Sequence, residues 1–384
     1  MSQRKYGIGF LFLFDSIGYV YKGKKFAVYL PEELLTNIFL RLGVNFLLRC
    51  KSVCKTWLSV ISNPLFVESQ LRRALMTPTL LIIDYPRAAG LPSTNIVNPF
   101  PRLFEKCNVV SCSYNGIVCL CDDNDAIYLW NPSIGKFKKL PPATRNRPPC
   151  LLRYDKVVFG YDSISDDYKV LKMVYENSKD FMRKVYVYST KTDSWRRFED
   201  RIMRKLNGFG QTDIVVNGVL YIKSGSELIT FDLHREVFGL IRVPDFFGKN
   251  MSNVLDFEGS VGIVFKSVGD AEGIFLWTLD DVSGQMQWTK KLRINAYPGS
   301  LWWLYCYLGA GLFFGKMVPD HDMFIHHILY DYETEETKLH VRENVCATVK
   351  YAKTLVSLNG FEPLGNMPTK SITGKKRSRG SSID

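Results

Sequence analysis

The sequence predicts an α+β chain that is mainly β, in which a short three-helix module precedes a larger domain of β-propeller type. Apolar residues recur at helical spacing between positions 30 and 70. Alternation of apolar and polar residues with period two takes over after Pro78. Within positions 77–360, a hairpin motif recurs at intervals of roughly 50 residues, which is typical of successive four-stranded blades.

The composition is that of an ordinary globular protein. The 384 residues are 46% hydrophobic and 23% charged, which excludes collagen-like, coiled-coil and wholly disordered chains. The formal net charge of +12 is concentrated at the two ends, with +7 on residues 1–75 and +5 on residues 350–384, so the region between them is neutral. A nucleic-acid-binding protein would more often carry a basic face on its main domain, and we therefore expect no nucleic-acid partner.

Two apolar stretches bear on export and membrane insertion. Asp15 interrupts the apolar run 8–14 after only seven residues, and no small-residue cleavage site follows, which disfavours a signal peptide. We expect residues 1–29 to be an extension outside the folded domains. Residues 294–315 carry no charge over 22 positions, which is long enough for a membrane-spanning helix. Pro298 and four glycines favour instead two buried strands joined by a glycine turn, so we expect no membrane partner.

The helical module is divided by residues that begin and end helices. Pro31 suits the first turn of a helix, Gly43 ends that helix, and Asn63-Pro64 ends a later one. Two apolar stripes lie between these breaks: Leu34, Leu35, Ile38, Phe39 and Leu42 in the first, and Val53, Trp57 and Ile61 in the second. Three short helices in about 40 residues bury little surface by themselves, so we expect the module to need a partner.

Three short motifs in this module carry a family resemblance. They are the opening Leu30-Pro31, the central Val53-Cys54-Lys55-x-Trp57 and the closing Pro64-x-Phe66. With these motifs in this order, residues 30–70 resemble an F-box. The resemblance implies docking onto the Skp-type adaptor of a Skp–cullin–F-box ubiquitin ligase, and through the adaptor onto a cullin. The adaptor-binding residues that it implies are Leu30, Pro31, Leu34, Ile38, Leu42, Leu47, Val53 and Trp57.

The module departs from that family pattern at two places. Proline is usual where this chain has Gly43, and a Lys-Ser pair is common where it has Asn45-Phe46. Glycine in place of proline loosens the unfolded chain and costs about 0.4–1 kcal/mol of stability. Whether Gly43 and Phe46 also weaken adaptor binding is left open by the sequence.

The larger domain consists of short expected strands and polar turns. The expected strands are Thr79–Asp84, Ile117–Cys121, 157–160, 169–174, 185–189, 215–222 and 261–265. Asn115-Gly116 and Asn217-Gly218 each predict a type I′ hairpin turn. The strand at Thr79–Asp84 and one near residues 348–358 belong to no repeat, and their pairing would close the ring.

The repeat itself is a large or β-prone residue followed by another after seven positions. The four regular copies are Trp130 and Phe137, Tyr188 and Trp195, Phe231 and Phe238, and Tyr330 and Thr337. A fifth, irregular copy runs from Trp277 to Trp288. Neither the glycine doublet of kelch repeats nor the Trp-Asp of WD repeats is present.

The hairpin phrases resemble the F-box-associated domain of plant F-box proteins, which is often described as F-box/kelch-repeat. The resemblance covers most of positions 105–360. The phrases that carry it include Trp130-Asn131-Pro132-Ser133, Phe159-Gly160-Tyr161-Asp162, Asp166-Asp167-Tyr168-Lys169-Val170 and Asn217-Gly218-Val219-Leu220-Tyr221. It implies a domain that holds a client protein.

No constellation in the sequence nominates a catalytic, metal or cofactor site. The cysteines Cys107, Cys112, Cys119 and Cys121 lack the paired spacing of a zinc site, and we expect ordinary core thiols. His321, His326 and His327 are expected at the surface or at an interface. Glycine-rich phosphate loops and nucleophile elbows are absent from the sequence.

The cysteines and the C-terminal residues give indications of the cellular compartment. Nine cysteines, an odd number, favour reduced thiols in the nucleus or cytoplasm. Residues 365–384 are expected to form a disordered basic tail. Its Lys375-Lys376-Arg377-Ser378-Arg379 run suits either a nuclear-import signal or a solubilising segment.

The sequence therefore favours a non-catalytic substrate receptor that binds the adaptor through the F-box and an unidentified client through the β-domain. Two alternatives are an F-box scaffold that acts outside a ligase and, less favoured, a propeller hydrolase. The client surface is expected on the loops at 145–150, 201–211 and 319–326.

Overall fold

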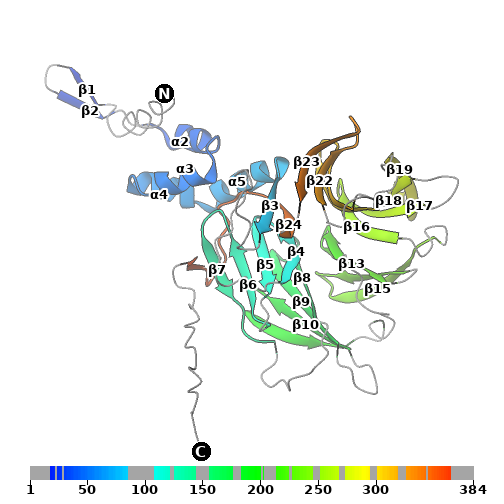
Figure 1. The fold of residues 1–384 in the computed structure, drawn as a ribbon. Coiled ribbons are helices and arrows are strands. Elements are labelled where there is room, and N and C mark those ends of the chain that lie inside the picture. The colour runs from blue at the N-terminus through cyan, green and yellow to red at the C-terminus, as the bar shows by residue number, and fades with distance from the viewer. Residues whose placement is uncertain are drawn as a thin grey trace, which may run out of the picture. The chain divides into compact units, whose positions relative to one another are not determined.

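The computed structural model consists of two compact units, residues 1–72 and 73–384, each of which is described by itself (Figure 1). The residues that the structure describes are 18–21, 24–27, 30–84, 108–121, 125–143, 155–175, 183–199, 202, 213–224, 227–244, 251–267, 273–294, 301–318, 326–342 and 345–364.

The first unit contains a small hairpin and a set of short helices. Strands β1 (Gly18–Tyr21) and β2 (Lys24–Ala27) pair only with each other, in the segment that we expected to lie outside the folded domains. The helices are α2 (Glu32–Phe39), α3 (Val44–Cys50), α4 (Lys55–Ser62) and α5 (Pro64–Met76), the last of which continues into the second unit.

Helix α5 is a fourth helix where the sequence analysis expected three. Asn63-Pro64 does end α4, as expected, but the same pair also begins α5. The side chain of Asn63 accepts a hydrogen bond from the backbone N–H of Leu65 at 2.9 Å, and Pro64 occupies the first helical position. Proline is favourable there because that N–H has no partner inside the helix, so one dipeptide both ends and starts a helix.

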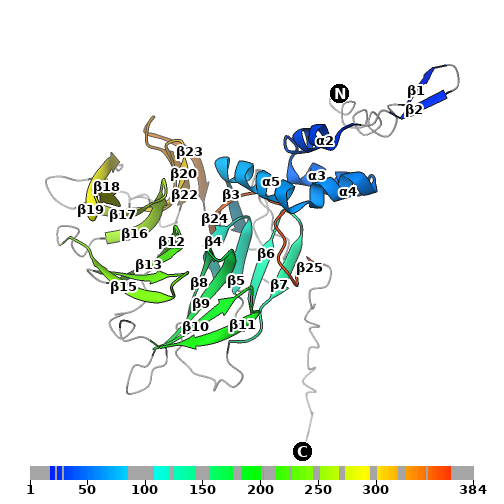
Figure 2. The ribbon, with the colours of Figure 1, turned by 180° about the vertical axis from the view of Figure 1, so that it is seen from behind.

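The second unit is a β-propeller with five four-stranded antiparallel sheets (Figures 1 and 2). The first two blades are β4 (Asn108–Tyr114), β5 (Ile117–Cys121), β6 (Ile127–Asn131) and β7 (Lys136–Lys139), then β8 (Asp155–Asp162), β9 (Asp167–Tyr175), β10 (Arg183–Ser189) and β11 (Ser194–Phe198). The third and fourth are β12 (Asp213–Val216), β13 (Val219–Ser224), β14 (Glu227–Asp232) and β15 (Val237–Arg242), then β16 (Met251–Phe257), β17 (Ser260–Ser267), β18 (Gly273–Val282) and β19 (Gln285–Ile294). The fifth is β20 (Leu301–Gly309), β21 (Leu312–Val318), β22 (His326–Asp331) and β23 (Glu336–Arg342).

A two-stranded sheet closes the ring, which confirms the pairing expected for the two strands outside the repeats. Strand β3 (Thr79–Asp84) pairs antiparallel with β24 (Val345–Tyr351). Strand β24 in turn contacts β20 of the fifth blade and β4 of the first. The two ends of the domain's sequence therefore meet in one sheet, and the number of full blades is five.

The seven-residue repeat corresponds to cross-strand pairs between the third and fourth strands of the blades. Trp130 lies opposite Phe137, Tyr188 opposite Trp195, Phe231 opposite Phe238 and Tyr330 opposite Thr337. The irregular copy is a longer hairpin, in which Trp288 pairs with Leu279. Large side chains at these positions fill the space between adjacent sheets, which is why they recur.

Both Asn-Gly turns are present, with positive φ at both residues. In the first, Asn115 has φ 53° and Gly116 has φ 78°. A Cβ on Gly116 would collide with the Thr354 side chain and the Ala352 carbonyl. Glycine is therefore required there both by the positive φ and by the lack of space. The second turn, at Asn217-Gly218, divides the expected strand 215–222 into β12 and β13.

A C-terminal segment fastens the first blade to the closing sheet. The hydroxyl of Thr354, which is fully buried, donates to the backbone carbonyl of Asn115 at 2.8 Å. The side-chain amide of Asn131 donates to the Val356 carbonyl at 2.8 Å and to the Thr354 carbonyl at 3.2 Å. The segment ends in β25 (Glu362–Pro363), which adds a fifth strand to the first blade beside β7.

The described part of the uncharged stretch 294–315 forms strands joined by a glycine turn, as expected. Strands β20 and β21 are joined by a turn at Ala310-Gly311, where φ is 48° and 78°. Leu304, Phe313 and Phe314 are almost wholly buried between sheets. Among the described residues, no helix is both long and apolar enough to cross a membrane.

Candidate functional site

The first helix of the module divides its apolar stripe between its own core and the solvent. Leu35 and Phe39 are buried, at 4% and 2% exposure. Leu34 and Ile38, one position earlier in each turn, are 51% and 36% exposed. A helix that needed only to stabilise its own unit would carry polar residues at such positions. The exposed pair therefore indicates a surface for a partner.

The other expected adaptor-binding residues differ in their exposure. Pro31 is exposed, whereas Leu47 is fully buried and packs inside the module. The half-buried residues are Leu30, Leu42, Val53 and Trp57. The Trp57 ring meets that of Phe39 edge to face, with centroids 5.1 Å apart, so Trp57 supports α2 from α4.

Three more exposed apolar residues of the module were not among the expected contacts. Phe46 is 59% exposed, Leu58 46% and Leu65 72%. The Arg49 guanidinium lies over the Phe46 ring, 5.9 Å from its centroid. The sequence carried a signal for Phe46, because an aromatic residue stands where a polar pair is common. Leu58 follows Trp57 directly and lies outside the helical stripe, so periodicity does not single it out.

The described strands define two ends of the propeller. At one of them, here called the hairpin end, the turns of neighbouring blades are bonded to each other. The Asn217 amide donates to the Gly259 carbonyl at 2.9 Å, and the Tyr307 hydroxyl donates to Glu258 at 3.3 Å. The Asn115 amide donates to the Tyr168 hydroxyl at 3.0 Å.

The three loops expected to bind a client connect strand ends at the opposite end of the ring. Two of them join the fourth strand of a blade to the first strand of the next, and the third joins β21 to β22. Antiparallel strands place all of these connections away from the hairpin end. Apart from residues 202 and 326, the loops lie outside the described residues, and their role stays a prediction.

An ionic cluster at the hairpin end ties the second blade to the third. The Lys169 ammonium lies 3.0 Å from Glu236 and 3.5 Å from Asp162, and His234 Nδ1 lies 3.2 Å from Asp162. Burial acts to raise the pKa of Asp162, but hydrogen bonds from the Ser165 and His234 side chains and from two backbone amides outweigh burial and lower it to about 2. Glu236 also pairs with Arg196 of the second blade, so the cluster joins the two blades through several ion pairs.

The residues examined for metal or acid–base chemistry lie mostly in the core. Cys119 is buried and Cys121 half-buried, while the side chains of Cys107 and Cys112 lie outside the described residues. His326 and His327 are each only 6% exposed, so neither lies at the free surface, one of the two placements expected for them, while His321 lies outside the described residues. The reason is their place on β22, an inner strand of the fifth blade.

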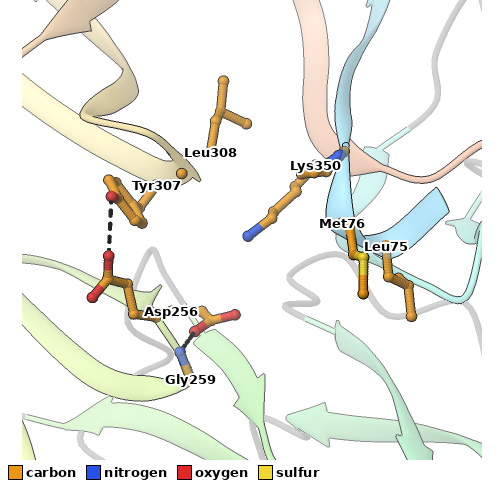
Figure 3. Close-up of a pocket in the computed structure, with 10 residues that line it drawn as sticks. Leu75, Met76, Asp256, Gly259, Tyr307, Leu308 and Lys350 are labelled. Atoms are coloured by element: carbon orange, nitrogen blue, oxygen red, sulfur yellow. Dashed lines mark hydrogen bonds between the residues drawn. The ribbon is translucent and has the colours of Figure 1, made fainter. Parts of the chain in front are cut away.

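A cavity of about 230 Å³ opens at the hairpin end, within the second unit (Figure 3). Its walls come from the fourth and fifth blades, from β24 and from the last turn of α5. Figure 3 shows Lys350 pointing into the space between Tyr307 and the end of α5. The lining residues are Leu75, Met76, Pro78, Asp256, Glu258, Gly259, Tyr307, Leu308, Gly309 and Lys350.

Comparison with known proteins assigns both parts of the chain. The model of the F-box domain family matches residues 29–69, and that of the F-box associated beta propeller domain family matches residues 91–306. F-box protein At4g22390 of Arabidopsis thaliana is 28% identical over 302 residues, which cover 69% of this chain and 73% of the relative. Putative F-box protein At1g46984 of the same plant is 30% identical over 293 residues, covering 68% and 72%. The solved structure of a protein of unknown function from Bacteroides caccae matches 64% of this chain and 86% of its own chain, at 11% identity. Its TM-score is 0.37, so the likeness is too low to support any conclusion about this chain.

Proposed function

This chain belongs to the plant F-box proteins that carry an F-box associated β-propeller domain, and on that premise we propose that it is the substrate-recognition subunit of a Skp–cullin–F-box ubiquitin ligase. An F-box interacts in general with a Skp-type adaptor, and F-box proteins are generally non-catalytic receptors. The proposal adds the cullin, which the adaptor would contribute, and a client protein held by the propeller in the nucleus or cytoplasm.

The observation that carries the proposal is the exposed apolar pair on α2. Leu34 and Ile38 present side chains to solvent from a helix whose neighbouring positions are buried. Burial of such apolar surface against a partner contributes about 25 cal/mol per Å². In a compact module with few core residues, this surface is the main source of binding energy for a partner. Adaptor docking explains why the surface is apolar.

The mechanism that we propose is proximity. The module would hold the chain on the ligase, and the propeller would hold a client near the enzyme that is loaded with ubiquitin. Two linked binding events raise the effective concentration of the client, so the transfer of ubiquitin becomes effectively intramolecular. Under this proposal the chain itself breaks no bond.

The test is adaptor binding by the purified full-length chain. A variant with Leu34→Asp and Ile38→Asp should lose affinity at least 30-fold, because two central apolar contacts are replaced by charges. Ile164→Asp is a matched control, since Ile164 is 74% exposed on the propeller and should bind the adaptor normally. Full binding by the double variant would remove the adaptor site from α2.

The scaffold alternative predicts a different outcome when the purified chain is offered both the adaptor and the cullin. If the chain captures the adaptor but the assembled complex excludes the cullin, the chain acts outside a ligase. Recovery of adaptor and cullin together supports the receptor, and its client can then be sought with the loops at 145–150, 201–211 and 319–326 deleted. These deletions should leave adaptor binding intact.

A further inference from the structure

We propose that the cavity at the hairpin end of the propeller binds a small zwitterion, specifically an α-amino acid with an apolar side chain. The residues that line the cavity all belong to the second unit, and none of them lies in α2 or in the expected client loops. Its volume of about 230 Å³ is below the roughly 300–1,000 Å³ usual for drug-sized ligands, which indicates a small molecule.

Charges of both signs face this cavity without neutralising each other. The Lys350 ammonium projects into it from β24, and the carboxylates of Asp256 and Glu258 line it from the fourth blade (Figure 3). Among the described residues, no carboxylate lies within 4.0 Å of the Lys350 ammonium. Lys350 is only partly exposed. A bound group of opposite charge could therefore pair with its ammonium inside the cavity.

The two carboxylates are held in place by local hydrogen bonds. Asp256 accepts from the backbone N–H of Gly259 at 2.8 Å through Oδ1. Glu258 accepts from the Tyr307 hydroxyl at 3.3 Å through Oε1. Each carboxylate has a second oxygen, which is available to accept from a ligand. The turn and the tyrosine therefore fix two acceptors at the cavity without occupying them fully.

This arrangement selects a ligand with both charges. A simple anion would meet Lys350 but would also face two carboxylates, and a simple cation would face the lysine. An α-amino acid places its carboxylate toward Lys350 and its ammonium toward Asp256 and Glu258. Opposite charges at both ends favour one orientation and disfavour singly charged molecules.

The remaining wall of the cavity specifies an apolar side chain. Leu75 and Met76, at the end of α5, are 49% and 81% exposed, and Pro78 and Leu308 complete that side. Figure 3 shows Leu75 and Met76 across the cavity from Tyr307. An aliphatic group of the ligand would remove part of this surface from water, which is favourable in proportion to its area.

The experiment is calorimetric titration of the full-length chain with L-leucine and three relatives that each lack one feature. N-acetyl-leucine lacks the ammonium, leucinamide lacks the carboxylate, and glycine lacks the apolar side chain. Leucine should bind, and each relative should bind at least tenfold more weakly. Lys350→Gln should lower the affinity for leucine at least tenfold, and Lys350→Arg should restore part of it.

Lys191→Gln is the matched control, because Lys191 is an exposed lysine in a turn of the second blade, and it should bind leucine normally. Thermal melting of each variant shows whether the propeller is folded. The proposal is overturned if leucine, isoleucine, valine and methionine all fail to bind the folded chain at millimolar concentration. Equal binding of leucine and its acetylated or amidated relative overturns it too, as does unchanged leucine binding by folded Lys350→Gln. None of these outcomes bears on adaptor docking.

Discussion

The helical module exposes many of its large apolar side chains for its size, whereas the propeller buries most of its own. Within residues 30–72, five large apolar side chains are at least 36% exposed: Leu34, Ile38, Phe46, Leu58 and Leu65. The described part of the much longer second unit exposes only Leu75, Met76, Ile164, Val237, Val282 and Met286 to that degree. Its aromatic side chains in the regular hairpins lie largely between sheets.

The difference shows that the two units cover their apolar residues by different means. A propeller closes on itself, so each blade covers its neighbour and the last sheet covers the first. A module of short helices has too little volume to cover its own apolar residues. The module is therefore the part of the chain that needs another molecule.

The largest effect is expected from a large-to-small change between two blades. Phe231 is fully buried, and its ring lies 4.6 Å from that of Phe238 and 5.8 Å from that of Phe198. Phe231→Ala should lower the free energy of unfolding of the propeller by about 3–5 kcal/mol. Urea unfolding measures this loss, and a change below about 1 kcal/mol would contradict the interlocking of blades.

A neighbouring pair on α2 tests the contrast inside a single helical turn. Leu35→Ala should destabilise the module by about 2–5 kcal/mol because it leaves a cavity. Leu34→Ala should change stability by no more than about 0.5 kcal/mol but should weaken adaptor binding. Thermal melts and adaptor titrations of the two variants separate the effects, and identical behaviour would show that α2 has no exposed binding face.

The pH dependence of stability is expected to follow the buried His327. Burial, with a smaller contribution from the Lys316 ammonium, lowers the pKa of His327 from 6.5 to about 4. The unfolded state therefore binds a proton more readily, and stability is full above pH 6.5 and falls as the pH drops toward 4, by up to about 3 kcal/mol.

His327→Gln, which stays neutral, should flatten the stability profile between pH 6.5 and 4. Unfolding by urea at several pH values measures the slope. Asp162 acts mainly below this range, because its pKa is 3.8 in the unfolded chain and about 2 in the folded protein, so its stabilising contribution is lost as the pH falls from about 4 toward 2. An unchanged slope in the variant would assign the acid sensitivity to other groups.

The closure of the ring is expected to depend modestly on a single hydroxyl. Thr354→Val keeps the shape of the side chain but removes the donor that meets the Asn115 carbonyl. The buried carbonyl then lacks that partner, which should cost about 1–3 kcal/mol. Differential scanning calorimetry measures the change, and Thr192→Val, at an exposed turn, is the control.

The smallest effect is expected from restoring the proline that the family usually carries. Gly43 has φ −71°, which proline adopts, and a Cβ there would meet no atom within 4 Å. Gly43→Pro should therefore raise stability by about 0.4–1 kcal/mol through the unfolded chain. A small increase in the melting temperature of the module is the readout, and a decrease would show that the glycine is needed in its present conformation.

The sequence predicted the elements and their repeat well because both depend on local patterns. The seven-residue spacing that begins at Trp130 became a cross-strand pair, and Asn115-Gly116 became a turn with positive φ at both residues. The sequence did not predict that Asn63-Pro64 begins α5, because the same residues end one helix and start another. It also did not place His326 and His327 in an inner strand, since polarity alone does not reveal such a position.

For the candidate site, the sequence identified the module and most of its apolar positions but not which of them face solvent. Leu34 and Leu35 are adjacent and chemically identical, and only the packing of α2 against α4 buries one and exposes the other. Phe46 and Leu58 were missed for the same reason. The side that an interface occupies is a property of the assembled helices.

By itself the sequence determined the two-part organisation, the blade hairpins and the F-box resemblance, because hydrophobic period, turn residues and short motifs are encoded over a few neighbouring positions. Tertiary structure alone decided which apolar residues remain exposed. It also brought Lys350, Asp256 and Glu258 to one cavity. Lys350 lies more than 90 positions after the two carboxylates in the chain, and only the closed ring of blades brings the three groups together.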